Sequence, residues 1–240
     1  MNAKTLGIVL HSIKYSDSSN IISVFTKDFG RVSYIVYGAH KKKSSVRSSF
    51  FQPLSIVEME VTHSPGRDLH RIKEIKMVHL FTEIPYHPVK NALALFLSEV
   101  LYRTLKQDDV DESLFLFLEN SIQQLDYCER GMANFHLVFL MKLTRYLGFA
   151  PNDDGREFRY FDLINGVFLQ ERPNHNHFIL PEVAKYFYSV LHTDYSALDS
   201  LVMSRETRVE IVEVLIEYYR LHLPDFHGVQ SIDVLQSLFD

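Results

Sequence analysis

The residues best suited to chemistry lie in one short stretch near the N-terminus, GAHKKKSSVRSSFFQP at residues 38–53. Its lysines and its arginine can pair with phosphate oxygens, and its serine hydroxyls can donate hydrogen bonds to the same oxygens. Val, Ile, Tyr and Phe dominate the runs on either side, which is typical of a polar loop between strands. Two interpretations are open: a phosphate-contacting arm, or a solvated loop, which is the commoner role of a lysine run.

The charge of the chain is distributed unevenly. All 240 residues together carry a formal charge of -5. Residues 1–82, however, hold 12 Lys and Arg against 6 Asp and Glu, whereas residues 83–240 hold 13 against 24. A basic first third on an acidic remainder favours a polyanion as the partner of the basic part.

Further cations and aromatic residues lie on both sides of the loop. Single-stranded nucleic acids bind where a positive groove meets aromatic rings on which bases stack. Tyr34 is such a ring, although it could equally pack in a core. The candidate nucleic-acid-binding residues are Arg31, Tyr34, Lys41, Lys42, Lys43, Arg47, Arg71, Lys73 and Lys76, with Ser44, Ser45, Ser48 and Ser49 as small donors. None belongs to a motif that reads base edges, so we expect binding that is largely independent of sequence.

No pattern in the sequence predicts an active site. His175 and His177 are the closest histidine pair, but no third ligand accompanies them, and a metal site needs three or four. Cys128 has no feature of a nucleophile, and Glu58 with Glu60 shows an alternation that exposed strands commonly share. Glycine-rich phosphate loops and nucleophile-elbow motifs do not occur in the sequence. We therefore expect a non-enzyme without catalytic residues, metal or cofactor.

The first third of the chain has the pattern of a small β domain. Strand-like runs rich in Val, Ile and Tyr span residues 6–14, 20–27, 31–37, 54–62 and 69–78. The last run also suits a helix, because its apolar residues recur every three positions. Five short strands with a long loop after the third predict a Greek-key barrel of the OB type.

The rest of the chain has the apolar period of helices. Their starts and stops are marked by capping and breaking residues: Pro88, Asp111, Gly148, Pro181 and Ser204. Asn165-Gly166 predicts a hairpin inside a small β region near 157–180, and residues 232–239 close the chain as a last helix. The expected fold is α+β, with an OB-type domain at 1–82 and a mostly helical domain at 83–240.

The sequence predicts a cytoplasmic protein without a membrane segment. No apolar run reaches the roughly 18 to 20 residues that span a bilayer. The N-terminus is too polar for a secretory leader. Cys128 is the only cysteine, which excludes both an internal disulfide and a zinc site built from cysteines.

Several segments resemble the RecO family of bacterial recombination mediators. The resemblance is carried by VLHSIKYSDSSNIISVFTKDFGRVSYIVYGAHKKKSS near the start, and by FFQPLSIVEMEV after it. YLGFAPN at residues 146–152 and the tail VQSIDVLQSLF extend it through nearly the whole chain. The strongest local motifs lie in the first sixty residues or so.

This resemblance implies a specific set of properties. RecO proteins have an N-terminal OB fold and a helical C-terminal domain, and they use no nucleotide. They bind single- and double-stranded DNA, anneal strands, and help RecA replace single-stranded DNA-binding protein (SSB) on DNA. Their partners are RecR, in many bacteria RecF, and the acidic C-terminal tail of SSB. The GAHKKKSS loop would contact DNA, with Arg31 on the preceding strand.

The sequence departs from the family pattern at two places. Where the family commonly has Lys-Gly-Ala-Arg, this chain has Tyr37-Gly38-Ala39-His40. His40 joins the candidate DNA-binding residues and could add pH dependence near its unperturbed pKa of roughly 6.5. Some members carry a four-cysteine zinc module that this chain cannot build. An SSB tail would need a local basic spot in the acidic part, and the available cations are Arg130, Lys142, Arg145, Arg156 and Arg159.

Three other functions remain open from the sequence. An RNA-binding OB protein would use the same cations and aromatic rings. A protein-interaction scaffold would carry the basic loop only as solvated surface. A hydrolase is the third alternative, and no motif favours it.

Overall fold

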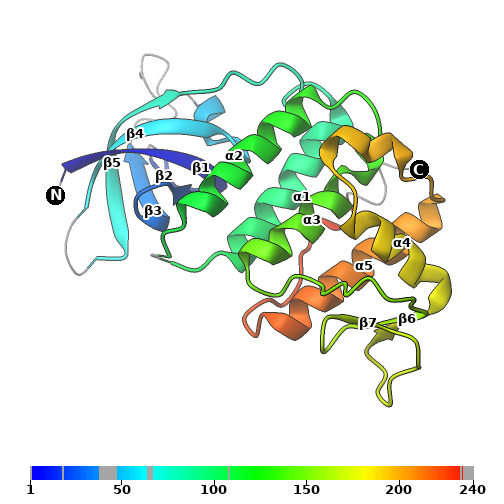
Figure 1. The fold of residues 1–240 in the computed structure, drawn as a ribbon. Coiled ribbons are helices and arrows are strands. Elements are labelled where there is room, and N and C mark those ends of the chain that lie inside the picture. Colours follow the sequence, from blue (N-terminus) through cyan, green and yellow to red (C-terminus); the bar gives the residue numbers. More distant parts are fainter. Residues whose placement is uncertain are drawn as a thin grey trace. The chain divides into compact units, whose positions relative to one another are not determined.

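Five runs rich in β-branched and aromatic residues form the strands of a closed barrel (Figure 1). The strands are β1 (Asn2–Ser16), β2 (Ser19–Thr26), β3 (Gly30–Tyr37), β4 (Ile56–Thr62) and β5 (Leu69–Met77), with a short 3-10 helix, η1 (Ser48–Phe51), before β4. The structure, a computed structural model, describes residues 2–17, 19–37, 48–63, 67–107, 109–232 and 234. All five predicted strands are confirmed, including 69–78, whose pattern also suited a helix.

The strands follow the order β1-β2-β3-β5-β4 around the barrel, and β1 closes it by pairing with β4. β3 and β5 run parallel, whereas the other neighbouring pairs are antiparallel. This is the Greek-key arrangement of a five-stranded OB-type barrel. The predicted α+β fold, an OB-type barrel followed by a mostly helical region, is confirmed.

Alternation along β3 decides which of its side chains enter the barrel. Val32, Tyr34 and Val36 are buried and belong to the barrel core, while the residues between them face outward and are more exposed. Successive side chains of a strand point to opposite faces, so Tyr34 and Tyr37 lie on opposite sides of the barrel wall. One tyrosine therefore stabilises the core and the other is available at the surface.

Two helices follow the barrel, α1 (Pro88–Thr104) and α2 (Glu112–Tyr127). Residues 1–126 form one compact unit, so both helices pack with the barrel. The Phe25 ring lies 6.2 Å from the Phe115 ring of α2, and the Lys27 ammonium lies 2.9 Å from the Glu112 carboxylate. As predicted, Asp111 caps α2, because its carboxylate accepts a hydrogen bond of 2.9 Å from the Leu114 backbone N–H.

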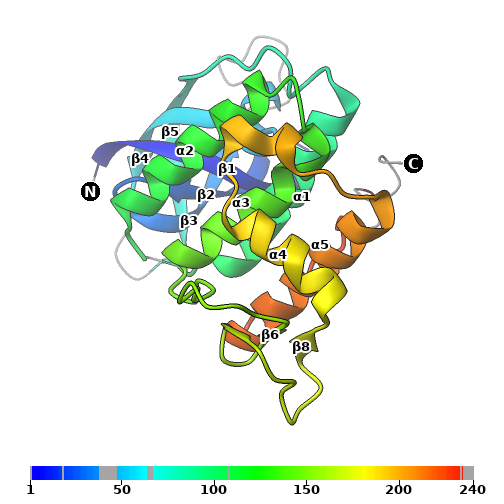
Figure 2. The same cartoon turned by 45° about the vertical axis from the view of Figure 1, so that its right-hand side comes forward.

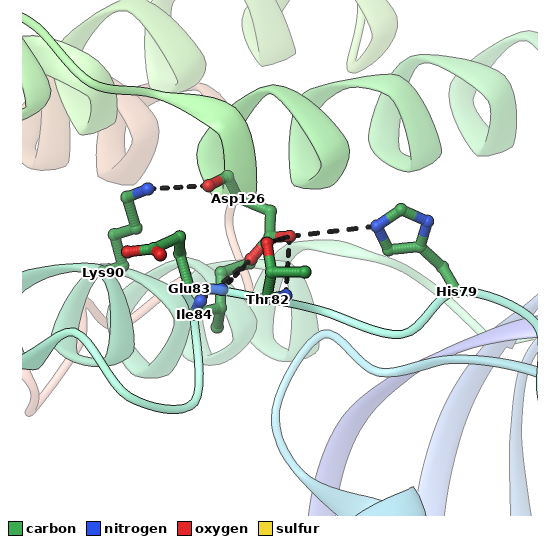
Figure 3. A network of polar contacts seen from close by, with 6 residues as sticks. All are labelled: His79, Thr82, Glu83, Ile84, Lys90 and Asp126. Atoms are coloured by element: carbon green, nitrogen blue, oxygen red, sulfur yellow. Dashed lines mark hydrogen bonds and ion pairs between the residues drawn. The ribbon is translucent and has the colours of Figure 1, made fainter.

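A fully buried carboxylate ties the segment after β5 to the end of α2 (Figure 3). Asp126 accepts backbone hydrogen bonds from Thr82 at 3.0 Å and from Glu83 and Ile84 at 2.9 Å each. The Lys90 ammonium, also buried, donates to the Asp126 backbone carbonyl at 2.6 Å. Burial alone would raise the pKa of Asp126, but the donating N–H groups prevail and lower it below its ordinary value.

The second compact unit, residues 127–240, packs three helices against one another (Figure 2). They are α3 (Phe135–Tyr146), α4 (Pro181–Leu191) and α5 (Arg205–His222), accompanied by the 3-10 segments η2 (Met132–Asn134) and η3 (Tyr195–Ser200). Ser204 caps α5 as predicted, since its hydroxyl accepts a hydrogen bond from the Thr207 N–H at 3.2 Å. In the described part of the chain, no helix is both long and apolar enough to cross a bilayer.

A small sheet completes this unit, with the order β7-β6-β8. Its strands are β6 (Tyr160–Asp162), β7 (Val167–Leu169) and β8 (Phe178–Ile179). The predicted hairpin at Asn165-Gly166 is confirmed, and Gly166 has the left-handed φ of 66° that such a turn requires. No sequence pattern marks β8, because the strand is too short to show one. Most of the helix expected at 232–239 lies outside the described residues.

Replacing Asp126 tests the buried carboxylate. We expect Asp126→Asn to lower the free energy of unfolding at pH 7 by roughly 2–3 kcal/mol. The reason is that the NH2 group of asparagine, which can only donate, would face backbone N–H groups that need an acceptor. A lowered pKa means that the stabilisation is present above the ordinary carboxyl pKa and disappears as pH falls through the folded value. Urea unfolding followed by circular dichroism should therefore show the two proteins converging below about pH 4. An unchanged gap at low pH would contradict this account.

His136 on α3 makes a second pH-dependent contribution. Burial lowers its pKa to about 3, and the nearby charge of Arg208 acts in the same direction. The unfolded chain then binds a proton that the folded chain excludes, so stability falls as pH drops below about 6.5. Between pH 7 and pH 5 we expect the free energy of unfolding to fall by about 2 kcal/mol because of this residue. His136→Leu should remove that slope in urea unfolding, while His87→Leu, at a less buried position, should leave it in place.

Candidate nucleic-acid interface

An open hollow of about 930 Å³ lies on the barrel, where β1 and β3 end and β5 begins. Strand pairing places these ends together: Ser16 of β1 pairs with Ser19 of β2, and Ser19 pairs with Tyr37 of β3. Ile35 of β3 lies opposite Arg71 of β5. The hollow is lined by Asn2, Tyr15, Ile35, Tyr37, Thr62, Arg67, Asp68, Leu69, His70, Arg71 and Lys73.

Positive charge exceeds negative charge around this hollow. Arg67, Arg71 and Lys73 are all exposed there, against the single carboxylate of Asp68. Among the described residues, Arg71 and Lys73 form no ion pair, so their charges remain available to a ligand. The hollow therefore has the electrostatics of a site for a polyanion.

Two tyrosines expose their rings at the same place. The exposed fraction is 64% for Tyr15 and 54% for Tyr37. The Arg71 guanidinium lies 5.5 Å from the centre of the Tyr37 ring, a cation–π contact that holds cation and ring together. A phosphate and a flat apolar group could both be bound here.

The predicted residues of β5 fall into two groups. Arg71 and Lys73 line the hollow. Lys76 lies farther along the strand and pairs with the Glu58 carboxylate at 2.7 Å, a hydrogen bond that lowers the pKa of Glu58. The Lys4 ammonium likewise forms an ion pair with the Glu60 carboxylate, at 2.9 Å. Lys76 thus belongs to a balanced patch of charge rather than to the hollow.

Arg31 is placed away from the hollow, at the other end of β3. Its guanidinium lies 5.2 Å from the centre of the Tyr102 ring on α1, and its backbone forms a bridge with Gln107. This half-buried side chain contributes to the contact between barrel and helix. A role of Arg31 in DNA binding stays a prediction.

Tyr34 packs in the barrel core, which is one of the two roles that the sequence left open. The side chain has no exposed surface, and its hydroxyl lies 3.0 Å from the His63 Nε2 atom. Burial raises the pKa of this hydroxyl far above its ordinary value. A base cannot stack on a ring that solvent does not reach, so Tyr34 is not part of the interface that we propose.

Five candidates of the basic loop lie outside the described residues: His40, Lys41, Lys42, Lys43 and Arg47. The chain enters this loop directly after Tyr37, which lines the hollow. Lys41 follows Tyr37 by four residues, so chain length limits the distance between their Cα atoms to roughly 14 Å. The sequence thus places the first loop cation within a few residues of a side chain that lines the hollow.

Tyr15, Tyr37 and Arg67 line the hollow but were not among the residues predicted to bind DNA. A signal was available for Tyr37, because Val32, Tyr34 and Val36 form one apolar face and Tyr37 falls on the other. Nothing comparable marks Tyr15 or Arg67. Their proximity depends on which strands become neighbours.

The histidines considered as metal ligands have other partners. His175 Nε2 lies 3.2 Å from an Asp162 oxygen, while His177 Nδ1 lies 3.5 Å from a Glu217 oxygen. Within the described ranges, no group of three His, Cys, Asp or Glu side chains could hold a metal ion. Cys128 donates from its thiol to the Arg130 carbonyl at 3.3 Å.

Tyr34→Phe separates packing from binding. The substitution keeps the buried ring and removes only the hydroxyl that contacts His63. We expect the free energy of unfolding to fall by about 1 kcal/mol. Affinity for single-stranded DNA, measured by fluorescence anisotropy, should stay unchanged. A variant with native stability and weakened DNA binding would return Tyr34 to the interface.

Comparison with known proteins places the chain in a family. The family model "Recombination protein O N terminal" matches residues 1–81, and "Recombination protein O C terminal" matches residues 86–229. The chain is 44% identical over 240 residues to a DNA repair protein RecO of Phocaeicola vulgatus, and all of both chains is covered. It is 45% identical to that of Bacteroides fragilis over 242 residues, again with full coverage, and 34% identical to that of Flavobacterium psychrophilum. The chain belongs to the RecO family.

Proposed function

We propose that this chain is a non-catalytic DNA-binding protein of recombinational DNA repair. Two matches to the family and full-length relatives named as DNA repair proteins support a role in repair. The observation that carries the binding proposal is the group of exposed cations around the barrel hollow, Arg67, Arg71 and Lys73, next to the start of the basic loop. Phosphate contacts supply most of the affinity of such sites.

The proposed binding is largely independent of DNA sequence. The cations of the hollow and loop can contact phosphates, which carry no sequence information. A mediator that acts wherever DNA is damaged requires that property. We propose that the chain binds single- and double-stranded DNA, anneals complementary strands, and helps load RecA onto SSB-coated DNA together with RecR.

The acidic second half is proposed to serve protein partners. The candidates are RecR, RecF and the acidic SSB tail. Two of the five cations considered for that tail are already paired, Lys142 with Asp194 and Arg156 with Asp154. Arg130, Arg145 and Arg159 are exposed and remain the better candidates. We propose that the boundary between the DNA-binding part and the partner-binding part lies near residue 82. We also propose that the protein acts in the cytoplasm, at the nucleoid.

The salt dependence of DNA binding tests the proposal. Fluorescence anisotropy would be recorded for labelled single-stranded DNA over a range of salt concentrations. Removing one phosphate contact to a single strand reduces the log-log slope by roughly 0.7. We expect Arg71→Gln with Lys73→Gln to flatten the slope by about 1.4, and glutamates at Lys41, Lys42, Lys43 and Arg47 to flatten it further.

A matched control removes the same charge elsewhere on the barrel. Lys4→Gln with Lys76→Gln also lowers the net charge by two, but both lysines are paired with glutamates. This control should retain a nearly native slope. Equal slopes in all variants would favour a protein-interaction scaffold, and tighter binding of a matched RNA would favour an RNA-binding protein.

A further inference from the structure

The outer face of the barrel presents an apolar row that leads into the hollow. Ile13 of β1 pairs with Ile21 of β2, and Ile21 pairs with Ile35 of β3. Tyr15 and Tyr37 each lie two residues beyond this row, on β1 and β3. Because β1 and β3 both pair antiparallel with β2, the two tyrosines extend toward the same end of the sheet.

One end of this row and the two tyrosines beyond it are exposed to solvent. Ile13 is 47% exposed, and Tyr15 and Tyr37 are more exposed still. An isolated apolar residue at the surface is ordinary, but adjacent ones on a single sheet face mark a place where a flat ligand can lie. Ser16, which follows Tyr15, pairs with Ser19 of β2, and Ser19 pairs with Tyr37, so two strand spacings of about 5 Å each separate β1 from β3 at this place.

Positive charge borders the row on the side of β5. β5 lies next to β3, where Arg71 is opposite Ile35 and contacts the Tyr37 ring. Lys73 follows two residues later on the same strand, also in the hollow. A strand of nucleic acid laid across the sheet could thus direct phosphates to β5 and bases to the tyrosines.

We propose that Tyr15 and Tyr37 stack on unpaired bases, and that this stacking makes the hollow prefer single-stranded over double-stranded DNA. This inference rests on the proposed function and specifies its substrate class. In a duplex the bases are already stacked on each other, so the rings can stack only on unpaired bases. The cations contact phosphates in either form and contribute no such preference.

The test uses fluorescence anisotropy to measure the affinity for two labelled DNAs: single-stranded oligo-dT, and the duplex that oligo-dT forms with oligo-dA. Stacking on one aromatic ring changes affinity by roughly tenfold. Tyr15→Ala with Tyr37→Ala should therefore weaken single-strand binding by roughly a hundredfold and duplex binding by less than about threefold. The salt slope for oligo-dT should remain native, since the phosphate contacts stay in place.

Two controls separate stacking from other effects of substitution. Tyr86 is 81% exposed and lies outside the hollow, so Tyr86→Ala should bind both DNAs as the native protein does. Tyr15→Phe with Tyr37→Phe keeps both rings and should retain the preference for single strands. Circular dichroism confirms that each variant is folded.

The outcomes distinguish the inference from the function on which it rests. If the double alanine variant bound both DNAs equally more weakly, or bound both as the native protein does, the stacking role would be overturned. DNA binding by the native protein would still support the proposed function. Weaker binding by the phenylalanine variant would also overturn stacking, because the rings are still present. Native protein that binds neither DNA would overturn the proposed function itself.

Discussion

The barrel depends on the way in which β1 pairs with β4 and β2 to close it. β1 pairs with β4 along residues 2–8 and with β2 along residues 7–16, so the two pairings overlap at Gly7 and Ile8. Gly7 is opposite Thr26 on one side and Val57 on the other. A Cβ atom there would lie 2.5 Å from a methyl of Val24 and 2.9 Å from the Met59 methyl. A glycine at this corner lets a small barrel close without displacing its own core.

Closure then determines which part of the outer surface is left for a ligand. α1 and α2 contact the barrel through residues such as Phe25, Lys27 and Arg31. Tyr15 and Tyr37 lie at the C-terminal ends of β1 and β3, and both stay exposed. The buried carboxylate of Asp126 fixes the segment that leads from β5 into α1. The helices thus occupy one end of the outer face and leave the other open.

Local sequence was sufficient for the elements and insufficient for the site. Alternation and turn residues predicted every strand of the barrel, and Asp111 and Ser204 marked helix starts because capping is a local interaction. The hollow is not local. It requires the parallel pairing of β3 with β5, which brings Arg71 opposite Ile35 from 36 residues away. Tyr34 and Tyr37 are different, because alternation along β3 is local and already separates the inward ring from the outward one.

An acidic protein can bind a polyanion if charge is segregated over distances longer than the screening length. At physiological ionic strength that length is about 8 Å, so a phosphate experiences chiefly the charges in its immediate surroundings. Near the hollow these are Arg67, Arg71 and Lys73. Elsewhere on the barrel, lysines such as Lys4 and Lys76 are neutralised by glutamates on adjacent strands. The net charge of -5 therefore describes the chain as a whole and says little about the surface that a phosphate meets.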